Sequence, residues 1–212
     1  MNSVFPQGLY AITDPKLLPG MTLFAGVESA IKGGASAIQY RDKMASSIER
    51  LNNAKYLRSL CTEYSVCLII NDDLELCQRV KADGVHLGKS DGDILHARAF
   101  LGEEKILGVT CHADLNYAER CIDLGVNYCA FGRLFPSKTK ADAPHCTLNI
   151  LKKAAKLDTH IVAIGGINTE NMQLIQQVNV QTLAMIHGIF GQINIESSAR
   201  EISSSLKHHR TI

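Results

Sequence analysis

The sequence has no long hydrophobic run and no excess of charge of either sign. No stretch approaches the roughly 20 apolar residues that a transmembrane helix requires. The formal net charge is +1 at pH 7, so any basic function must be local, with no overall attraction to nucleic acid or membrane. The first residues, MNSVFPQGLYAIT, lack the basic segment and apolar core of a signal peptide. We therefore expect a cytoplasmic protein that binds neither nucleic acid nor membrane.

The cysteines form no recognisable framework. There are seven, an odd number, and no two have the C-x-x-C spacing typical of zinc sites and redox motifs. Cys67 and Cys129 lie inside apolar, strand-like segments. We expect reduced core cysteines rather than disulfides or a zinc site. The chain also lacks a linker, a low-complexity segment or a break in composition, so we interpret residues 1–212 as one domain.

What the sequence does contain is a repeated pattern of short apolar segments, each followed by a segment with helical periodicity. The eight β-rich segments start at Leu9, Ser36, Val66, Asp83, Lys105, Asn127, His160 and Thr182. Strands that are nearly all apolar are buried on both faces, as in a parallel sheet. Eight β/α units predict an α/β fold, a single-domain (β/α)8 TIM barrel, with an open doubly wound sheet as the alternative.

Polar residues gather at the ends of these strands, where a TIM barrel carries its active site. The second strand ends in QYRDK. Side chains alternate along a strand, so Gln39, Arg41 and Lys43 share one face, while Tyr40 and Asp42 share the other. Two cations and an amide on one face indicate an anionic ligand. Exposed strand-end cations without a ligand are the alternative.

Acidic residues follow the next two strands. Asn71 and Asp72 end the third strand, and Asp91 follows the fourth. Because neighbouring strands lie about 4.8 Å apart, Asp72 and Asp91 could share Mg²⁺, which takes oxygen ligands and keeps waters and substrate phosphate in its shell. The alternative is that one or both cap a helix, and Asp91 in SDGDILHA is a plausible N-cap.

The later strands end in groups that suit substrate and phosphate contacts. Thr110 in GVTCH presents a hydroxyl, whereas the lone His112 beside it is more typical of a packing or capping residue. The loop FGRLFPSKTKADAP carries Arg133, Lys138 and Lys140. The seventh strand ends in AIGGI, and paired glycines let backbone N–H groups approach a phosphate, as loops after strands seven and eight frequently do.

The predicted rim therefore has two anion-binding regions. One consists of backbone amides near Gly166, and the other combines Arg41, Lys43 and Lys140 with magnesium. The second suits a pyrophosphate group, because a metal and cations neutralise charge that develops on a leaving group. The sequence shows no general base beside a Ser or Cys nucleophile, which favours chemistry driven by departure of the leaving group.

In chain order, the motifs GLYAITD, QYRDK, INDD, DGVHLGKSD, GVTCH, GRLFPSKTK and AIGGI resemble those of the thiamine phosphate synthase family, from about Gly8 to Ile189. The resemblance implies a transferase with a (β/α)8 barrel that joins 4-amino-2-methyl-5-hydroxymethylpyrimidine diphosphate to a thiazole phosphate. The products would be thiamine phosphate and pyrophosphate, with carbon dioxide when the thiazole is carboxylated. The implied mechanism is dissociative: pyrophosphate leaves, a pyrimidine-stabilised cation forms, and the thiazole nitrogen captures it.

The resemblance also implies the site residues. The pyrimidine diphosphate would be bound by Gln39, Tyr40, Arg41, Asp42, Lys43 and Asn71. Arg41, Lys43 and Lys140 would be catalytic on its phosphates, and Asp72 and Asp91 would hold Mg²⁺. Thr110 would seat the pyrimidine or the departing group. The thiazole phosphate would be contacted by Ser137, Lys138, Thr139, Gly166, Ile186 and His187, the last two through their backbone.

Four residues depart from the family pattern. They are Lys89, Arg133, Ser137 and His187, where Gln, Pro, Thr and Ser are more usual. Two other functions stay open: a thiazole tautomerase-like isomerase on the same barrel, and a non-catalytic binder of thiamine intermediates. A tautomerase has no need of a metal-bound diphosphate with its cations, and intact metal and diphosphate residues argue against a non-catalytic binder. The expected partners are the two small-molecule substrates, and a homo-oligomer is left open.

Overall fold

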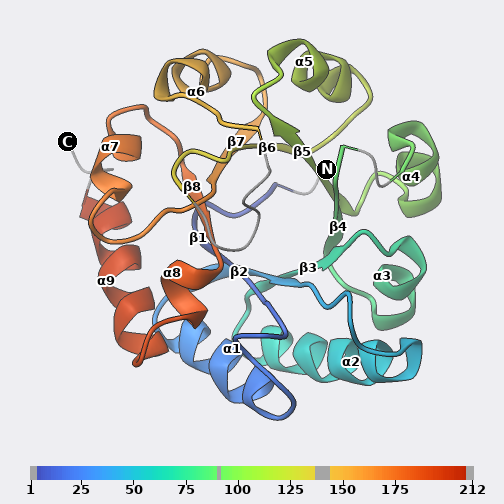
Figure 1. The fold of residues 1–212 in the computed structure, drawn as a ribbon. Coiled ribbons are helices and arrows are strands. Elements are labelled where there is room, and N and C mark those ends of the chain that lie inside the picture. Colours follow the sequence, from blue (N-terminus) through green and yellow to red (C-terminus); the bar gives the residue numbers. More distant parts are fainter. Residues whose placement is uncertain (1–3, 90–91, 137–143, 209–212) are drawn as a thin grey trace.

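The computed structural model describes residues 4–89, 92–136 and 144–208. Its parallel strands close into one barrel in which sequence neighbours pair, and the last strand pairs with the first (Figure 1). The strands are β1 (Gly8–Ile12), β2 (Ala35–Tyr40), β3 (Cys67–Asn71), β4 (Gly84–Leu87), β5 (Ile106–His112), β6 (Tyr128–Phe131), β7 (His160–Ile164) and β8 (Thr182–Met185). The predicted (β/α)8 barrel is confirmed, and the open sheet is excluded.

Helices form a ring around the barrel (Figure 1). They are α1 (Thr22–Lys32), α2 (Ser47–Glu63), α3 (Leu74–Val80), α4 (Ile94–Leu101), α5 (Leu115–Asp123), α6 (Leu148–Ala154), α7 (Met172–Gln176), α8 (His187–Phe190) and α9 (Ile195–His208). Gly125, just after the end of α5, has φ +81°, a left-handed conformation that glycine adopts without strain. Over residues 4–89, 92–136 and 144–208, none of the helices combines the length and apolarity needed to cross a membrane.

Aspartates cap the helices that follow β3 and β4, and they are not the ones that the sequence singled out. Asp73 accepts from the backbone N–H of the third residue of α3, at 2.9 Å. Asp93 accepts from two N–H groups of α4, at 2.7 and 3.2 Å. The alternative in which Asp72 or Asp91 is the N-cap is therefore wrong. Asp72 is left at the mouth of the barrel, and Asp91 lies outside the described residues.

The N-terminal end of the barrel interior is filled by aromatic side chains. Phe5, 1 % exposed, stacks on the ring of Tyr128 with centroids 4.2 Å apart and meets Tyr10 edge-on at 5.0 Å. Gly108 makes this packing possible, because a Cβ at that position would lie 1.9 Å from Cζ of Tyr128. This apolar plug fills the barrel interior at the N-terminal ends of the strands.

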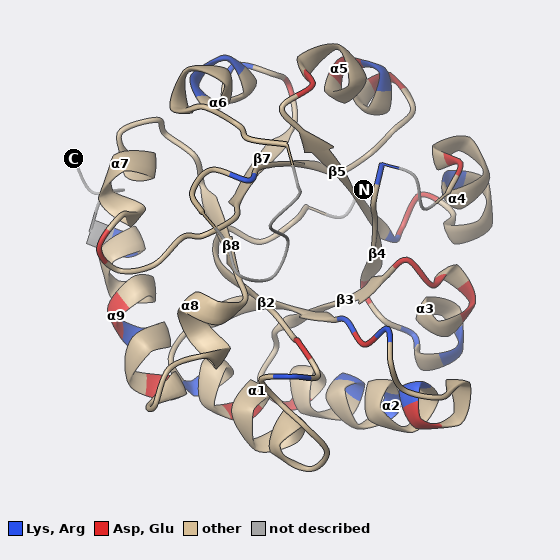
Figure 2. Ribbon diagram, viewed as in Figure 1, with Lys and Arg blue, Asp and Glu red and all other residues tan. Residues whose placement is uncertain are grey.

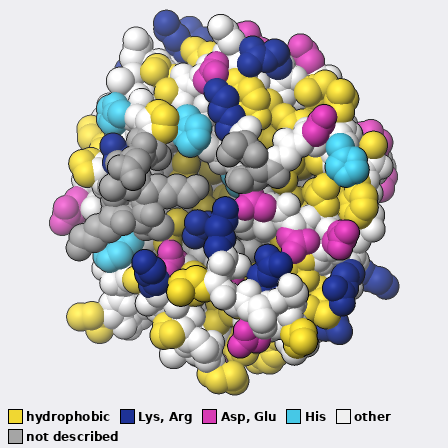
Figure 3. All heavy atoms as spheres, turned by 45° about the vertical axis from the view of Figure 1, so that its right-hand side comes forward, with side chains coloured by type: hydrophobic (Ala, Val, Ile, Leu, Met, Phe, Trp, Pro, Cys, Tyr) yellow, Lys and Arg dark blue, Asp and Glu magenta, His cyan; other side chains and the backbone are white. Residues whose placement is uncertain are grey.

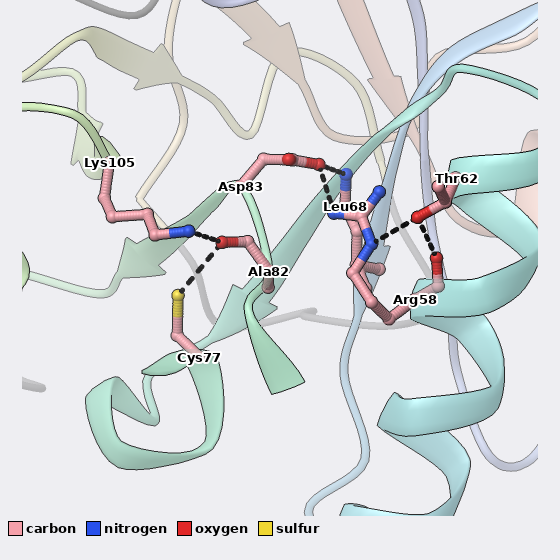
Figure 4. Close-up of polar contacts among 7 residues, drawn as sticks. All are labelled: Arg58, Thr62, Leu68, Cys77, Ala82, Asp83 and Lys105. Atoms are coloured by element: carbon pink, nitrogen blue, oxygen red, sulfur yellow. Dashed lines mark hydrogen bonds and ion pairs between the residues drawn. The ribbon is translucent and has the colours of Figure 1, made fainter. Parts of the chain in front are cut away.

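Charged side chains on the N-terminal face, which we call the floor, bond to the protein itself (Figure 4). Oδ2 of Asp83, just before β4, accepts from the backbone N–H of Leu68 and from Nη1 of Arg58, both at 2.7 Å. Nζ of Lys105 donates to the carbonyl of Ala82 at 2.6 Å. These bonds tie the starts of β3, β4 and β5 together, so the floor is built for stability.

The seven cysteines are free thiols, and six of them are buried. Burial raises the pKa of Cys61 to about 12 and that of Cys77 to about 11. These thiols therefore stay protonated at neutral pH, and a protonated, buried thiol is neither a good nucleophile nor a good metal ligand. The cysteines belong to the packing of the barrel and its helices.

Candidate active site

A cavity opens at the C-terminal ends of the strands. Its base is apolar, with Ile12, Ala130, Val162 and Ala184 among the side chains that line it, and its rim is polar. The predicted site residues that line it are Gln39, Arg41, Lys43, Asn71, Asp72, Thr110 and Ile186. Figure 2 shows basic and acidic segments alternating on the loop from β2 into α2. An apolar pocket with a charged rim suits a heteroaromatic ring that carries a phosphate group.

The predicted alternation along the QYRDK segment holds. Gln39 is 2 % exposed and points into the barrel, where its Nε2 donates to the hydroxyl of Tyr10 at 2.6 Å. Tyr40 packs in the opposite direction, in the core between barrel and helices, and its hydroxyl accepts from Nδ2 of Asn53 on α2 at 3.3 Å. The structure therefore does not bring Tyr40 to the cavity.

Asp42 shapes the loop that leads into α2. Its Oδ1 accepts from the backbone N–H groups of Met44 and Ala45, at 2.9 and 3.0 Å. Its side chain borders a neighbouring hollow with Lys43 and Asp72 rather than the main cavity. Asp42 therefore fixes the backbone beside the site, and the structure does not place it among the cavity-lining residues.

Arg41 is held by its backbone, which leaves its guanidinium available. The hydroxyl of buried Thr13 accepts from Arg41 N at 2.8 Å and lies 3.1 Å from Arg41 O, to which it donates. Within the described part of the chain, no hydrogen bond or ion pair engages the Arg41 side chain. An arginine fork matches phosphate oxygens in geometry and charge. Thr13, which the sequence analysis missed, is the residue that anchors this strand end.

Lys43 and Asp72 form an ion pair at the mouth, with Nζ 3.1 Å from Oδ2. The same oxygen accepts from Nδ2 of Asn71 at 2.6 Å. Asp72 has φ +63°, a left-handed conformation that Asp and Asn tolerate best among residues with a Cβ. The Lys43 side chain is 55 % exposed, and such surface pairs contribute only about 0–1 kcal/mol. A phosphate or a cation can therefore displace either partner at low cost.

The donor set around Asp72 fits a hard divalent cation. Carboxylate and amide oxygens are the groups that Mg²⁺ takes from proteins. Among the residues that the structure describes, no three His, Cys, Asp or Glu side chains gather as a metal centre. That agrees with a Mg²⁺ held by one or two carboxylates and completed by substrate phosphate and water. Asp91, the predicted second ligand, is not among the described residues.

Thr110 takes part in a chain of hydrogen bonds that the sequence analysis did not foresee. The hydroxyls of Tyr10 and Tyr128 lie 3.0 Å apart, and Tyr128 Oη lies 2.9 Å from Nδ1 of His86. Nε2 of His86 lies 2.8 Å from Oγ1 of Thr110. The chain begins at Gln39 and ends at the mouth. The sequence held one signal of these hydrogen bonds, namely polar side chains at inward positions of otherwise apolar strands.

Arg133, one of the departures from the family pattern, lines the mouth cavity together with Arg41 and Lys43. Its backbone N donates to Pro144 O at 3.1 Å, and its carbonyl accepts from Cys146 N at 2.8 Å. These bonds join the two ends of the loop that follows β6. Arg133 therefore adds a positive charge to the residues that line the mouth.

Lys89, the second departure, is engaged away from the cavity. Its Nζ lies 2.8 Å from Oδ2 of Asp114 and 4.8 Å from the ring centre of Tyr117. Oδ1 of Asp114 also accepts from the backbone N–H of Tyr117 at 2.9 Å. Lys89 and this N–H together hold the pKa of Asp114 below its usual value. His112, with φ +53°, lines both the main cavity and the small hollow beside Lys89.

A second cavity, of about 330 Å³, adjoins the first on the side of β7 and β8. The two share Ile164, Gly165, Ala184 and Ile186. Gly166 has φ +67°, and a Cβ there would lie 2.4 Å from the carbonyl oxygen of Pro136, so only glycine fits. Three predicted residues, Gly166, Ile186 and His187, line this cavity. His187 begins α8, where the first backbone N–H groups of a helix lack intrahelical partners.

Four predicted residues cannot be placed. Ser137, Lys138, Thr139 and Lys140 lie outside the described residues. The face that Figure 3 shows has basic, acidic and hydrophobic side chains interspersed. Arg41, Lys43 and Arg133 nevertheless line one cavity, in a protein whose net charge is +1.

The chain is similar to known proteins over almost its whole length. The family model for thiamine monophosphate synthase matches residues 9–189. A thiamine-phosphate synthase from Alcanivorax borkumensis is 45 % identical over 209 residues, which is 97 % of this chain and 96 % of that protein. One from Marinobacter nauticus is 44 % identical over 100 % of this chain and 96 % of its own.

Solved structures show the same architecture. The thiamine phosphate pyrophosphorylase of Pyrococcus furiosus superposes with a TM-score of 0.88 at 31 % sequence identity, and the match covers 96 % of each chain.

Proposed function

The chain belongs to the thiamine monophosphate synthase family, and we propose that its mouth joins a pyrimidine diphosphate to a thiazole phosphate. The enzyme is a transferase that forms thiamine phosphate and releases pyrophosphate, together with carbon dioxide when the thiazole is carboxylated. One observation carries the proposal: a cavity rimmed by Arg41, Lys43 and Asp72 adjoins a second cavity lined by Gly166 and the start of α8. Two adjacent anion sites suit two phosphorylated substrates.

The geometry supports a separate place for each substrate. The pyrimidine ring would occupy the apolar base of the first cavity, with its diphosphate against Arg41, Lys43 and Asn71 on the rim. The thiazole phosphate would bind in the second cavity, with its phosphate at the backbone of Gly166, Ile186 and His187. The shared wall between the cavities would bring the two rings together, and holding reactants in contact is itself a large part of catalysis.

The reaction would be driven by departure of the diphosphate. Negative charge builds on the leaving oxygens as the bond to the pyrimidine methylene breaks, and fixed cations stabilise that charge without reorganisation. Arg41 and Lys43 would supply positive charge from the loop that follows β2, and Arg133 adds a further cation to the same cavity. Lys140 is proposed for the same role from the loop after β6. The apolar base keeps water from the pyrimidine cation until the thiazole nitrogen captures it.

Mg²⁺ is the proposed cofactor, held by Asp72 and Asp91. When bound, it supplies positive charge to the diphosphate oxygens. The Lys43 ammonium already marks the position of a cation at the Asp72 carboxylate. Asp72→Asn keeps a residue that tolerates the left-handed backbone but removes the charge. We expect this variant to bind Mn²⁺, used as a spectroscopic substitute, at least about tenfold more weakly, since a coordinating carboxylate is lost.

A three-arm assay tests the function. The purified protein with Mg²⁺ receives the pyrimidine diphosphate alone, the thiazole phosphate alone, or both, and thiamine phosphate is quantified by chromatography. Thiamine phosphate in the third arm only is the expected result. Conversion of the thiazole phosphate in the second arm would instead identify a tautomerase-like isomerase, and saturable binding without product in any arm would identify a binder.

A further inference from the structure

The hydrogen bonds from Gln39 to Thr110 have a definite direction. The amide Nε2 of Gln39 has hydrogens and no lone pair to offer, so it donates to Tyr10 Oη at 2.6 Å. The single proton of Tyr10 is then free for Tyr128 Oη at 3.0 Å. The proton of Tyr128 is in turn directed to Nδ1 of His86 at 2.9 Å. Tyr10, Tyr128 and a neutral His86 each have one proton for these bonds, and the reverse direction would leave the buried Tyr10 proton without an acceptor in the described part of the chain.

Burial keeps the two tyrosine hydroxyls of this hydrogen-bond chain protonated. Tyr10 is 1 % exposed and Tyr128 is fully buried. Loss of solvent raises the pKa of both phenols well above the usual value, so both stay protonated at neutral pH. Phe5 covers the rings from below, at 4.2 Å from Tyr128 and 5.0 Å from Tyr10 between centroids. Bulk water therefore does not reach the hydroxyls from the floor side.

The strand register explains why His86 and Tyr128 meet. Gly108 of β5 pairs with His86 of β4 on one side and with Tyr128 of β6 on the other. Because Gly108 has no side chain, the Tyr128 ring lies across it and the hydroxyl reaches the imidazole. The imidazole and phenol rings are stacked, with centroids 5.5 Å apart. The contact is built into the barrel and does not depend on a mobile loop.

An imidazole whose Nδ1 accepts a hydrogen bond is neutral and carries its proton on Nε2. Nε2–H of His86 therefore donates to Oγ1 of Thr110 at 2.8 Å. The hydroxyl proton of Thr110 is not used in that bond. No other group within the described part of the chain receives it, and Thr110 lines the mouth cavity. The proton is consequently presented to whatever occupies the cavity.

A second pair of the same residue types shows what a purely structural pair looks like. On the floor, Nε2 of His160 lies 2.7 Å from Oγ1 of Thr182. There the threonine hydroxyl donates to the backbone carbonyl of Pro6 at 3.2 Å. The floor pair thus ends on a protein acceptor, whereas the mouth pair ends at the cavity.

On these grounds we infer that His86 is a positioning residue, which the Tyr10–Tyr128 hydroxyl pair holds in its Nε2–H tautomer so that Thr110 acts as a hydrogen-bond donor. The recipient is an acceptor atom of the bound pyrimidine diphosphate, and here the inference rests on the proposed function. The leaving diphosphate oxygen is the acceptor whose charge grows during the reaction. A donor aimed at it lowers the barrier more than it strengthens binding of the substrate.

Two variants of His86 separate its two nitrogen contacts. His86→Gln places an amide nitrogen near the position of Nε2 and can still donate to Thr110. His86→Asn places a polar atom only near the position of Nδ1 and loses the hydrogen bond to Thr110. We expect His86→Asn to lower kcat about 10²-fold, as loss of a transition-state donor does, with the KM for the pyrimidine diphosphate nearly unchanged. His86→Gln should lose less than about tenfold.

A double-mutant cycle tests whether His86 acts through Thr110. Thr110→Val removes the hydroxyl at nearly constant volume and should lower kcat about as much as His86→Asn. The double variant should be no slower than Thr110→Val alone, because the two changes remove one donor. His160→Asn, the matched change on the floor, should leave kcat unchanged. Additive losses in the double variant, or equal losses from His86→Asn and His86→Gln, would overturn the inference.

The tautomer itself can be measured without substrates. The ¹⁵N shifts of labelled histidine distinguish a protonated from an unprotonated ring nitrogen, and the His86 signals are assigned by their loss in His86→Gln. We expect His86 to be protonated on Nε2 and not on Nδ1. Protonation on Nδ1 would contradict the inference while leaving the synthase function intact, and failure of the three-arm assay would contradict the function while leaving the tautomer intact.

Discussion

The mouth and the floor of this barrel use the same kinds of residue for different ends. Each has a histidine–threonine pair and a cation–carboxylate pair. On the floor, Arg58 and Asp83 lie 2.7 Å apart, and the same carboxylate oxygen is also bonded to the backbone (Figure 4). At the mouth, Lys43 and Asp72 meet at 3.1 Å with Lys43 mostly exposed. Floor residues form their hydrogen bonds within the protein, whereas at the mouth the Arg41 guanidinium and the Thr110 hydroxyl proton have no acceptor in the described part of the chain.

Two arginines show the contrast most clearly. Arg98, 9 % exposed, donates to the carbonyls of Gly102, Lys105 and Gly125 and to Oδ1 of Asn127, at 2.7 to 3.2 Å. Those acceptors precede β5 and β6, on the floor. Arg41 has no such side-chain bonds within the described ranges. A buried guanidinium that is fully bonded holds a fold together, whereas one left unbonded beside a cavity is available for an anion.

The largest effect is expected at the mouth. Arg41→Ala should lower kcat/KM about 10³-fold, because it removes a fixed charge from the departing diphosphate, and should leave the melting temperature within about 2 °C of the wild type. Arg41→Lys is the matched control and should recover part of the activity, since it restores the charge without the fork. Steady-state kinetics and calorimetry measure the two effects. A large drop in melting temperature with unchanged kinetics would place Arg41 among the structural residues.

The next effect is expected on the floor, with the opposite signature. Arg98→Lys keeps the charge but cannot reach all four acceptors, and we expect a loss of about 3 kcal/mol in the free energy of unfolding, since buried acceptors are left without donors. For a chain of this length that corresponds to a fall of about 6–12 °C in melting temperature. The kcat of the folded enzyme should not change. The exposed Arg79→Lys on α3 serves as the control, with an effect below about 0.5 kcal/mol.

A smaller effect on stability is expected for the ion pair of the floor. Asp83→Asn retains an acceptor for the Leu68 N–H but removes the charge opposite Arg58, so the free energy of unfolding should fall by about 1–2 kcal/mol. Urea denaturation at pH 7 measures it. The matching change at the mouth, Asp72→Asn, should lower the free energy of unfolding less than Asp83→Asn does, and should lower kcat more. Equal stability losses for the two variants would contradict the division between floor and mouth.

The smallest effect concerns pH and the exposed pair of Lys89 and Asp114. The pKa of Asp114 is lowered by Lys89 and by the Tyr117 N–H, so folding favours its ionised form. Its contribution is therefore present above the ordinary pKa of aspartate, about 3.9, and is lost as the pH falls through the lowered value. The melting temperature of wild type should exceed that of Asp114→Asn at pH 7, and the difference should vanish in acid. A difference that grows in acid would refute this assignment.

The sequence predicted the fold and the charged rim because both follow from the order of strands. A closed parallel barrel brings every strand end to one face, so Arg41, Lys43, Asp72 and Thr110 had to be near one another. The sequence could not show which aspartate is the N-cap of α4. Asp93 and Asp91 are the same residue type two positions apart, and only the backbone path into α4 distinguishes them.

The hydrogen-bond chain at His86 was beyond the sequence for a different reason. It depends on the register of three strands, which puts Gly108 level with both His86 and Tyr128. Short apolar strands carry little information about register, because several alignments bury their side chains equally well. A polar residue at an inward position is visible in a sequence, but its partner on another strand is not.

The most direct test of the account is the stoichiometry of the complete reaction. With Mg²⁺ and both substrates, ³¹P NMR follows the pyrimidine diphosphate, the thiazole phosphate, thiamine phosphate and pyrophosphate in one sample. The account predicts that thiamine phosphate and pyrophosphate rise together in a one-to-one ratio as both substrates fall. Release of inorganic phosphate in place of pyrophosphate, or loss of thiazole phosphate without thiamine phosphate, would contradict a mouth built to release a diphosphate.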